Sequence, residues 1–313
     1  MQKIYLIILL SILSLSIEYK PVIGIYGVVS PSDDYTKYNK ETLDEALVRW
    51  LEDEGAKIII IHHWYSHEIL DEITSKINGI LLPGVLRKKN SLDNLWESNA
   101  KYLIEKSIEK KIPIIGICRG FLLLSSIIGN NMNILSLYNN KRAFNVEIIP
   151  ESFKAKLFSL FQPKNFEEMK NLLTTPFYHI RGIIPEDFRK NKILNDNFII
   201  TSYGYDKNGK KFIGSIESKN MSKFEIYGLQ FHPEKAPYIR HPRYKNKQTS
   251  DTIERSQLIA LFFVNEARKN NHKFSEMDFK KFDFIDTYNR NKNADYDYEM
   301  NTFTFYKDNK REK

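Results

Sequence analysis

Short apolar runs alternate with helical patterns over the first 130 residues, and no other feature constrains the fold of this chain as strongly. The runs are too short for helices and rich in isoleucine, valine and leucine, as expected of strands buried on both faces. The segments between them carry apolar residues at helical spacing, for example Leu43, Leu47, Trp50 and Leu51. We expect strands at residues 21–29, 57–61, 77–85 and 112–117, and helices at 40–54, 68–76, 96–110 and 121–128. This alternation predicts an α/β three-layer sandwich with a mostly parallel central sheet.

The pattern changes after about residue 133. Four segments there look like strands of a smaller antiparallel β region, at residues 144–149, 198–202, 212–216 and 225–231. The turn Asp206-Lys207-Asn208-Gly209 is typical of a β-hairpin. Leucine and phenylalanine at helical spacing predict a helical insertion at 153–174.

The N-terminus differs from the rest of this 313-residue chain, which is 42% hydrophobic and 27% charged. A basic start at Lys3 precedes an apolar block from Ile4 to Ile17 that is interrupted only by serines. The block is shorter than the ~20 residues of a membrane span and is typical of a cleaved secretory signal peptide. We therefore expect a signal peptide at 1–16, one domain at 17–274 and a polar, aromatic C-terminal extension at 275–313, with no membrane anchor after cleavage.

A net charge of +8 is spread along the chain. Basic clusters at 87–89 and 207–211 have acidic neighbours and no regular aromatic interleave, so we expect no nucleic-acid partner. A solvated face is the ordinary interpretation of these clusters. Attraction of an anionic small-molecule substrate is the alternative.

The single cysteine, Cys118, lies between a predicted strand and a predicted helix in Gly116-Ile117-Cys118-Arg119-Gly120. This is the cysteine form of the nucleophile elbow, a sharp turn that needs small flanking residues. The exposed N–H groups at the start of a helix also favour a thiolate. Spacing alone does not separate a nucleophile from a small buried core cysteine. An unpaired cysteine in a secreted chain indicates either a bridge to another chain or a free reactive thiol.

A strand ending at Phe231 is followed by His232-Pro233-Glu234. His232 and Glu234 are two residues apart, so in extended backbone they point to the same side. A carboxylate beside an imidazole sets its tautomer and stabilises the imidazolium. A lone histidine after a strand is ordinarily a surface residue, but its occurrence with an elbow cysteine favours catalysis. His62, His63 and the Pro83-Gly84-Val85 turn follow other strands, and we expect them to converge on Cys118.

These stretches together resemble the γ-glutamyl hydrolases, a family of cysteine-type omega peptidases in the class I glutamine amidotransferase-like superfamily. The resemblance rests on Pro83-Gly84, on the elbow, on the stretch from Gln230 to Tyr238, and on residues 256–274, and it runs from about residue 21 to 274. It implies a flavodoxin-like fold and an enzyme that cleaves γ-glutamyl peptide bonds, with folate poly-γ-glutamates as the substrate class. It also implies a lysosomal, vacuolar or extracellular location, a homodimer, and no metal or other cofactor.

Residue roles carry over from the family by motif. Cys118 would be the nucleophile that forms a γ-glutamyl thioester, His232 the general base and acid, and Glu234 the orienting carboxylate. Backbone N–H groups of Arg119 and of the Gly84–Val85 turn would form the oxyanion hole. The substrate-binding residues would be Gln230 and His179.

Two departures from the family pattern leave alternatives open. Val85 stands where the family usually has a second glycine, and Leu122 where it usually has Glu or Gln. One alternative is a hydrolase of another γ-glutamyl amide or a glutamine amidase. Another is a catalytically weakened γ-glutamyl-binding pseudoenzyme.

Overall fold

The computed structural model describes residues 20–29, 40–84, 94–138, 143–144, 146–171, 175–176, 179–239, 248–287, 291–292 and 301–306. The predicted signal peptide, the basic cluster at 87–89 and Val85 lie outside the described residues. Among the described residues, no helix has the length and apolar character needed to cross a bilayer.

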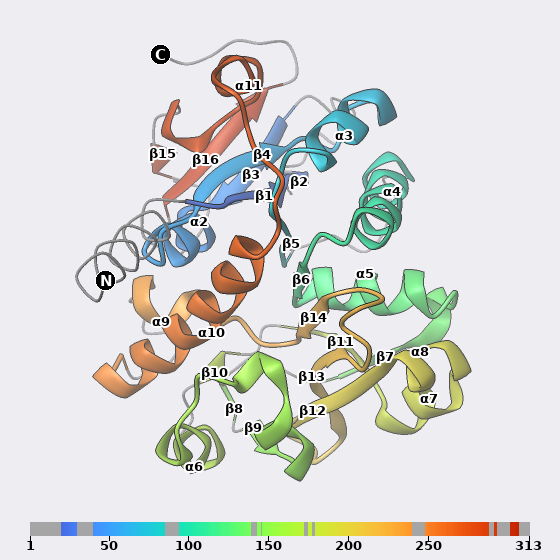
Figure 1. Ribbon diagram of the computed structural model, residues 1–313. Helices are drawn as coiled ribbons and strands as arrows, with labels where there is room; N and C mark the ends of the chain where they lie inside the picture. The colour runs from blue at the N-terminus through green and yellow to red at the C-terminus, as the bar shows by residue number, and fades with distance from the viewer. Residues whose placement is uncertain are drawn as a thin grey trace, which may run out of the picture.

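An eight-stranded sheet forms the centre of the molecule, as predicted for the α/β sandwich (Figure 1). Its first five strands are mutually parallel, and the other three continue the same sheet in antiparallel fashion. The antiparallel β region is therefore an extension of the central sheet. In spatial order the strands are β4 (Lys57–Ile61), β1 (Val22–Tyr26), β5 (Gly79–Leu82), β6 (Ile114–Ile117), β14 (Ile226–Leu229), β13 (Lys211–Ser218), β12 (Phe198–Tyr205) and β9 (Val146–Ile148).

Helices cover both faces of this sheet (Figure 1). Alternate side chains of β4 enter different cores, because successive residues of a strand point to opposite faces. Ile58 and Ile60 pack in the core that contains Trp50 and Phe263, on the side of α2 (Glu45–Glu52) and α10 (Ser250–Arg268). Ile59 and Ile61 pack in the second core, beside α3 (His67–Thr74), α4 (Asn94–Lys110) and α5 (Arg119–Ile128).

The helix predicted at 40–54 begins later than expected. Residues Lys40–Asp44 form strand β3, and α2 starts at Glu45. Strand β3 pairs with β2 (Val28–Val29) and with β16 (Asn301–Tyr306), in a four-stranded sheet that also contains β15 (Asn291–Lys292). The prediction was wrong because the partner strand comes from the far end of the chain, which local periodicity does not reveal.

The described parts of the C-terminal extension pack on the core. After α11 (Glu276–Lys281), the backbone N–H of Ile60 donates to the carbonyl of Asp283 at 3.0 Å, which covers the open edge of β4. Phe282 and Phe284 enter one core, and Phe303 and Phe305 of β16 enter the other. The extension therefore contributes to both layers.

Short elements complete the described chain. The hairpin predicted at Asp206–Gly209 joins β12 to β13, with Gly209 at φ +77°. The insertion predicted at 153–174 contains the 3₁₀ turn η3 (Lys156–Phe158) and helix α6 (Pro163–Asn171). The smaller elements are the paired strands β7 (Leu135–Leu137) and β11 (Arg181–Ile183), the paired strands β8 (Ala143–Phe144) and β10 (Thr175–Pro176), the helices α6 (Pro163–Asn171), α7 (Pro185–Lys190), α8 (Lys192–Asn197) and α9 (Lys235–Tyr238), and the 3₁₀ turns η1 (Met132–Ile134), η2 (Pro150–Lys154), η3 (Lys156–Phe158) and η5 (Ile285–Thr287).

Candidate active site

Cys118 lies at the apex of a sharp turn between β6 and α5, as the elbow motif predicts. Its backbone has φ +52° and ψ −105°, a conformation that non-glycine residues rarely adopt. The flanking glycines permit the turn. A Cβ on Gly116 would lie 2.7 Å from the carbonyl carbon of Gly120, and a Cβ on Gly120 would lie 2.6 Å from the carbonyl carbon of Leu82. The surrounding strands and helix thus hold the buried thiol in a strained backbone.

His232 reaches this thiol because β14 lies beside β6, with Leu229 in register with Ile117. Its Nδ1–H donates to Oε1 of Glu234 at 2.7 Å, and both side chains are buried. Burial opposes a positive charge on the ring, but the charge of Glu234, and then the charge and hydrogen bond of Cys118, outweigh it and raise the pKa of His232 to about 9. Burial likewise disfavours a charged Glu234, but His232 outweighs it and holds the pKa of this carboxyl below its usual value.

The turn after β5 lies against His232 and Cys118. A Cβ on Gly84 would lie 2.6 Å from Cε1 of His232 and 3.2 Å from Cβ of Cys118, so the backbone approaches the thiol where a side chain would not fit. Arg119 opens helix α5, and its guanidinium pairs with Glu97 of α4 at 3.0 Å. Gly84 and Arg119 therefore lie beside the thiol, and Val85 lies outside the described residues.

Of the two predicted substrate-binding residues, Gln230 lies next to the thiol, and His179 lies close enough to His232 to be affected by its charge. Nε2 of Gln230 is 3.9 Å from Sγ of Cys118. His179 donates from Nδ1 to the carbonyl of Arg181 at 2.8 Å, and its ring meets Phe212 edge-on at 4.7 Å. Burial lowers the pKa of His179 to about 4, and the nearby charge of His232 acts in the same direction. His179 is therefore neutral at physiological pH.

His62 and His63 do not join this site, contrary to the expected convergence. Strand β4, which they follow, is at the edge of the sheet, and β1 and β5 lie between it and β6. Neighbouring strands are about 4.8 Å apart, so the ends of β4 and β6 are separated by roughly 14 Å. The prediction was wrong because hydrophobic periodicity identifies strands without giving their order.

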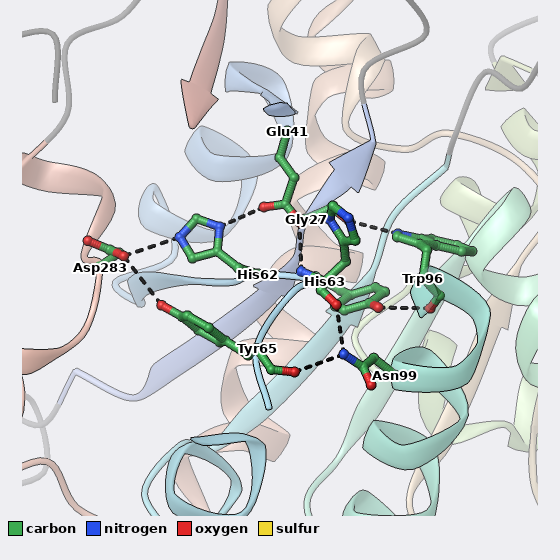
Figure 2. Close-up of polar contacts among 9 residues, drawn as sticks. Gly27, Glu41, His62, His63, Tyr65, Trp96, Asn99 and Asp283 are labelled. Carbon is green, nitrogen blue, oxygen red and sulfur yellow. Dashed lines mark hydrogen bonds and ion pairs between the residues drawn. The ribbon is translucent and has the colours of Figure 1, made fainter. Parts of the chain in front are cut away.

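The two histidines instead form a second buried polar cluster with Glu41 of β3 (Figure 2). The Glu41 carboxylate accepts from His62 Nδ1 at 2.6 Å, from the backbone N–H of His63 at 2.6 Å and from the His63 ring. On its other side, His62 donates from Nε2 to Asp283 at 3.2 Å, and the hydroxyl of Tyr65 donates to the same carboxylate at 3.3 Å. The cluster therefore joins β3, β4 and the C-terminal extension.

Opposite charges stabilise one another within this cluster. Burial opposes protonation of His62, but Glu41 and Asp283 outweigh it and raise the pKa of His62 to about 9. Burial also disfavours a charged Glu41, yet the two histidines hold its pKa below the usual value. Within the described residues, no three His, Cys, Asp or Glu side chains are arranged to hold a metal ion.

Sequence reasoning missed a lysine beside Glu234. Nζ of Lys235 lies 3.9 Å from Oε1 of Glu234 and 3.5 Å from Oδ2 of Asp44, at the end of β3. The adjacency of Lys235 to Glu234 in the sequence was the available signal. No local signal places Asp44 there, because the segment was predicted to be helical.

Comparisons with known proteins show the family to which this chain belongs. The family model for class-I glutamine amidotransferases matches residues 36–249. "Gamma-glutamyl hydrolase B" of Dictyostelium discoideum is 30% identical over 295 residues, which cover 91% of this chain and 83% of that protein. This chain belongs to the γ-glutamyl hydrolase family. It is therefore an enzyme of a hydrolase family within the class-I glutamine amidotransferase superfamily, as the sequence resemblance implies.

Other members of the γ-glutamyl hydrolase family are similar over most of their length. "Gamma-glutamyl hydrolase" of Homo sapiens is 27% identical over 265 residues, which cover 82% of this chain and 80% of that protein. "Gamma-glutamyl hydrolase 1" of Arabidopsis thaliana is 27% identical over 273 residues, which cover 82% of this chain and 74% of that protein.

Proposed function

We propose that this enzyme cleaves the γ-glutamyl peptide bonds of folate poly-γ-glutamates through a thioester on Cys118. The observation that carries the proposal is the strained elbow cysteine next to the His232–Glu234 pair. A thiol, a base and an orienting carboxylate in succession are the groups that nucleophilic acyl transfer requires. The substrate class rests on the family resemblance.

In the first half of the reaction, the Cys118 thiolate attacks the γ-carbonyl carbon of the substrate. The carbonyl oxygen becomes an oxyanion, which backbone N–H groups of Arg119 and of the turn at Gly84 stabilise. Protonated His232 then donates its proton to the leaving amine as the C–N bond breaks. The products of this half are a γ-glutamyl thioester and the released glutamyl chain.

In the second half, neutral His232 takes a proton from water while the water oxygen attacks the thioester carbonyl. The tetrahedral intermediate collapses, the C–S bond breaks, and the thiolate returns beside a protonated His232. Glu234 holds the ring with its Nδ1–H directed away from the reacting atoms. The released product carries a free γ-carboxylate.

The test is hydrolysis of a poly-γ-glutamyl folate by the wild type and by Cys118→Ala, followed from pH 4 to 10. We expect the variant to lose about 10⁴-fold or more in kcat/KM with an unchanged melting temperature, because no other group can form the thioester. Intact mass spectrometry of quenched wild type should detect a γ-glutamyl adduct on Cys118.

Three outcomes would contradict the proposal in different ways. Undiminished turnover by Cys118→Ala would show that Cys118 is not the nucleophile. Faster turnover of glutamine or of another γ-glutamyl amide than of the poly-γ-glutamyl folate would show that folate poly-γ-glutamates are not the preferred substrate class. A folded wild type that binds the substrate without turnover would favour the pseudoenzyme.

A further inference from the structure

The two oxygens of the buried Glu234 carboxylate have different surroundings. Its Oε1 accepts the Nδ1–H of His232 at 2.7 Å. Its Oε2 is buried, and no donor among the described residues reaches it. A buried carboxylate with one hydrogen-bonded oxygen depends on nearby positive charge to stay ionised.

His232 supplies that charge during only part of the proposed cycle. The ring is protonated when the thiolate attacks, but it has given its proton to the leaving amine once the thioester has formed. Glu234 then faces a neutral imidazole while it remains buried. At this stage burial favours uptake of a proton by the carboxyl.

A second cation, the ammonium group of Lys235, lies near Oε1 of Glu234. The side chain of Lys235 is 8% exposed, and its Nζ lies 3.9 Å from Oε1 of Glu234. Lys235 has no part in proton transfer, so its charge persists when His232 is neutral. Its charge helps to hold the pKa of Glu234 below the usual value.

The other elements packed around Glu234 complete the charge distribution. From β3, Oδ2 of Asp44 lies 3.5 Å from Nζ of Lys235. From α10, the neutral hydroxyl of Ser256 donates to the carbonyl of Pro233 at 2.6 Å. Behind the His232 ring lies Cys118. Asp44 thus pairs with Lys235 from strand β3. This strand pairs with β16, with Thr302 in register with Asp44.

We propose that Lys235 is a positioning residue that keeps Glu234 ionised while His232 is neutral. An ionised Glu234 accepts from Nδ1–H and so leaves the lone pair of Nε2 available to take the proton from water. A protonated Glu234 would instead donate toward Nδ1, and the proton on Nε2 would block its action as a base. Lys235 therefore supports thioester hydrolysis more than thioester formation. This inference rests on the proposed roles of Cys118, His232 and Glu234.

The experiment compares Lys235→Met and Lys235→Gln with Lys235→Arg from pH 4 to 10. Without the positive charge, Glu234 takes up a proton at higher pH when His232 is neutral. We expect the acid limb of kcat to move up by about one pH unit in the Met and Gln variants, with kcat about 10-fold lower at pH 5 and a smaller loss at pH 8. Quenched-flow measurements should show more γ-glutamyl thioester on Cys118 than in the wild type. Lys235→Arg should restore the wild-type profile.

The matched control is Lys192→Met, which removes a lysine that is 88% exposed and paired with Asp196. Its pH profile should equal that of the wild type. The Gln variant retains a polar end group on a slightly shorter side chain, so it provides the answer if the Met variant does not fold. Equal losses at every pH in Met, Gln and Arg variants would indicate packing alone and overturn the inference, as would an unshifted acid limb.

Failure of this inference is distinguishable from failure of the proposed function. If the wild type hydrolyses the substrate and Cys118→Ala does not, the proposed function holds whatever the Lys235 variants do. If Cys118→Ala retains turnover, the proposed function fails, and the inference fails with it.

Discussion

At the residue scale, the candidate site depends on backbone geometry as much as on side-chain chemistry. Cys118 has a positive φ, Gly84 lies where no side chain fits, and Gly120 lies against the carbonyl of Leu82. The turn at Gly84 brings main chain close to the thiol, and the contact of Gly120 holds the start of α5 against β5. These surroundings hold the buried thiol beside His232, as the proposed reaction requires.

The charge on Glu234 should control the basic limb of the pH profile. His232 has a pKa of about 9, raised from 6.5 despite burial, so the wild type should stay active until pH rises through about 9. In Glu234→Gln the attraction to the imidazolium is lost, so the pKa of His232 falls and the basic limb moves to lower pH. We expect kcat/KM to fall by about 10²- to 10⁴-fold.

The measurement is kcat/KM from pH 4 to 10 for the wild type and Glu234→Gln. Glu254→Gln, which alters a surface ion pair with Lys164, is the control and should match the wild type. A basic limb that stays at the same pH in Glu234→Gln would show that Glu234 does not set the protonation of His232.

At the scale of elements, strand β3 connects two charged regions. Glu41, near its start, binds the rings of His62 and His63, and Asp44, at its end, pairs with Lys235 beside Glu234. Both carboxylates are directed by a strand that pairs with β16. The strand conformation of residues 40–44 is thus needed for both contacts, since a helix would change the spacing of these side chains along the chain.

Glu41→Gln should destabilise the fold by roughly 3–5 kcal/mol, because it leaves a buried imidazolium without its main partner. The effect should depend on pH. The folded-state pKa of His62 is raised to about 9, so its contribution is complete below its unfolded pKa of about 6.5 and is lost as pH rises through about 9. Glu41 has a lowered pKa, so its contribution is present above about 4.5 and is lost at lower pH.

Urea unfolding of the wild type and Glu41→Gln at a series of pH values tests this. The difference in unfolding free energy should be largest between about pH 5 and 7 and smaller above about pH 9. Asp196→Asn, in an exposed pair with Lys192, should change stability by less than about 1 kcal/mol. A difference that is constant with pH would mean that His62 is not charged in the folded protein.

At the scale of the whole molecule, the C-terminal extension belongs to the folded enzyme. It covers the edge of β4 at Asp283 and adds β16 beside β3, and its phenylalanines enter both cores. The family model ends at residue 249, well before these contacts. The extension therefore stabilises strands β3 and β4, which lie within the region that the family model matches, although the extension itself lies outside that region.

Phe305→Ala tests this arrangement. The Phe305 ring is buried and lies 5.4 Å from the His62 ring, so its loss should lower the free energy of unfolding by roughly 3–5 kcal/mol. Met277→Ala, in the same extension but 81% exposed, should change it by less than about 0.5 kcal/mol. Equal stability of the two variants in urea would place the extension outside the cooperative core.

The predicted signal peptide concerns the location of the whole molecule. Residues 1–16 should direct the chain into the secretory pathway and be removed, because the apolar block suits a signal peptide better than a span. Mass spectrometry of protein secreted from eukaryotic cells should find an N-terminus near Ile17 or Glu18. Detection of intact Met1 in the mature protein would contradict the prediction, and a version lacking residues 2–16 should remain inside the cell.

The sequence by itself determined the features that depend on neighbouring residues. The alternation of apolar runs and helical patterns gave the parallel α/β sheet, because strand and helix periodicities are local. The elbow around Cys118 and the His232–Glu234 pair were also predictable, since each motif brings its own groups together within a few residues. That the two motifs act together was implied by the family resemblance, whereas the rule on strand ends also predicted a convergence of His62 and His63 that the structure does not show.

Only the tertiary structure decided which of those strand ends lie together. It placed His62 and His63 at the edge of the sheet, because strand order depends on pairing between distant segments. It made residues 40–44 a strand, because β16 supplied hydrogen-bond partners that local propensity cannot anticipate. The contact of Asp44 with Lys235 follows from that pairing. Contacts between segments remote in sequence are therefore what the sequence pattern did not contain.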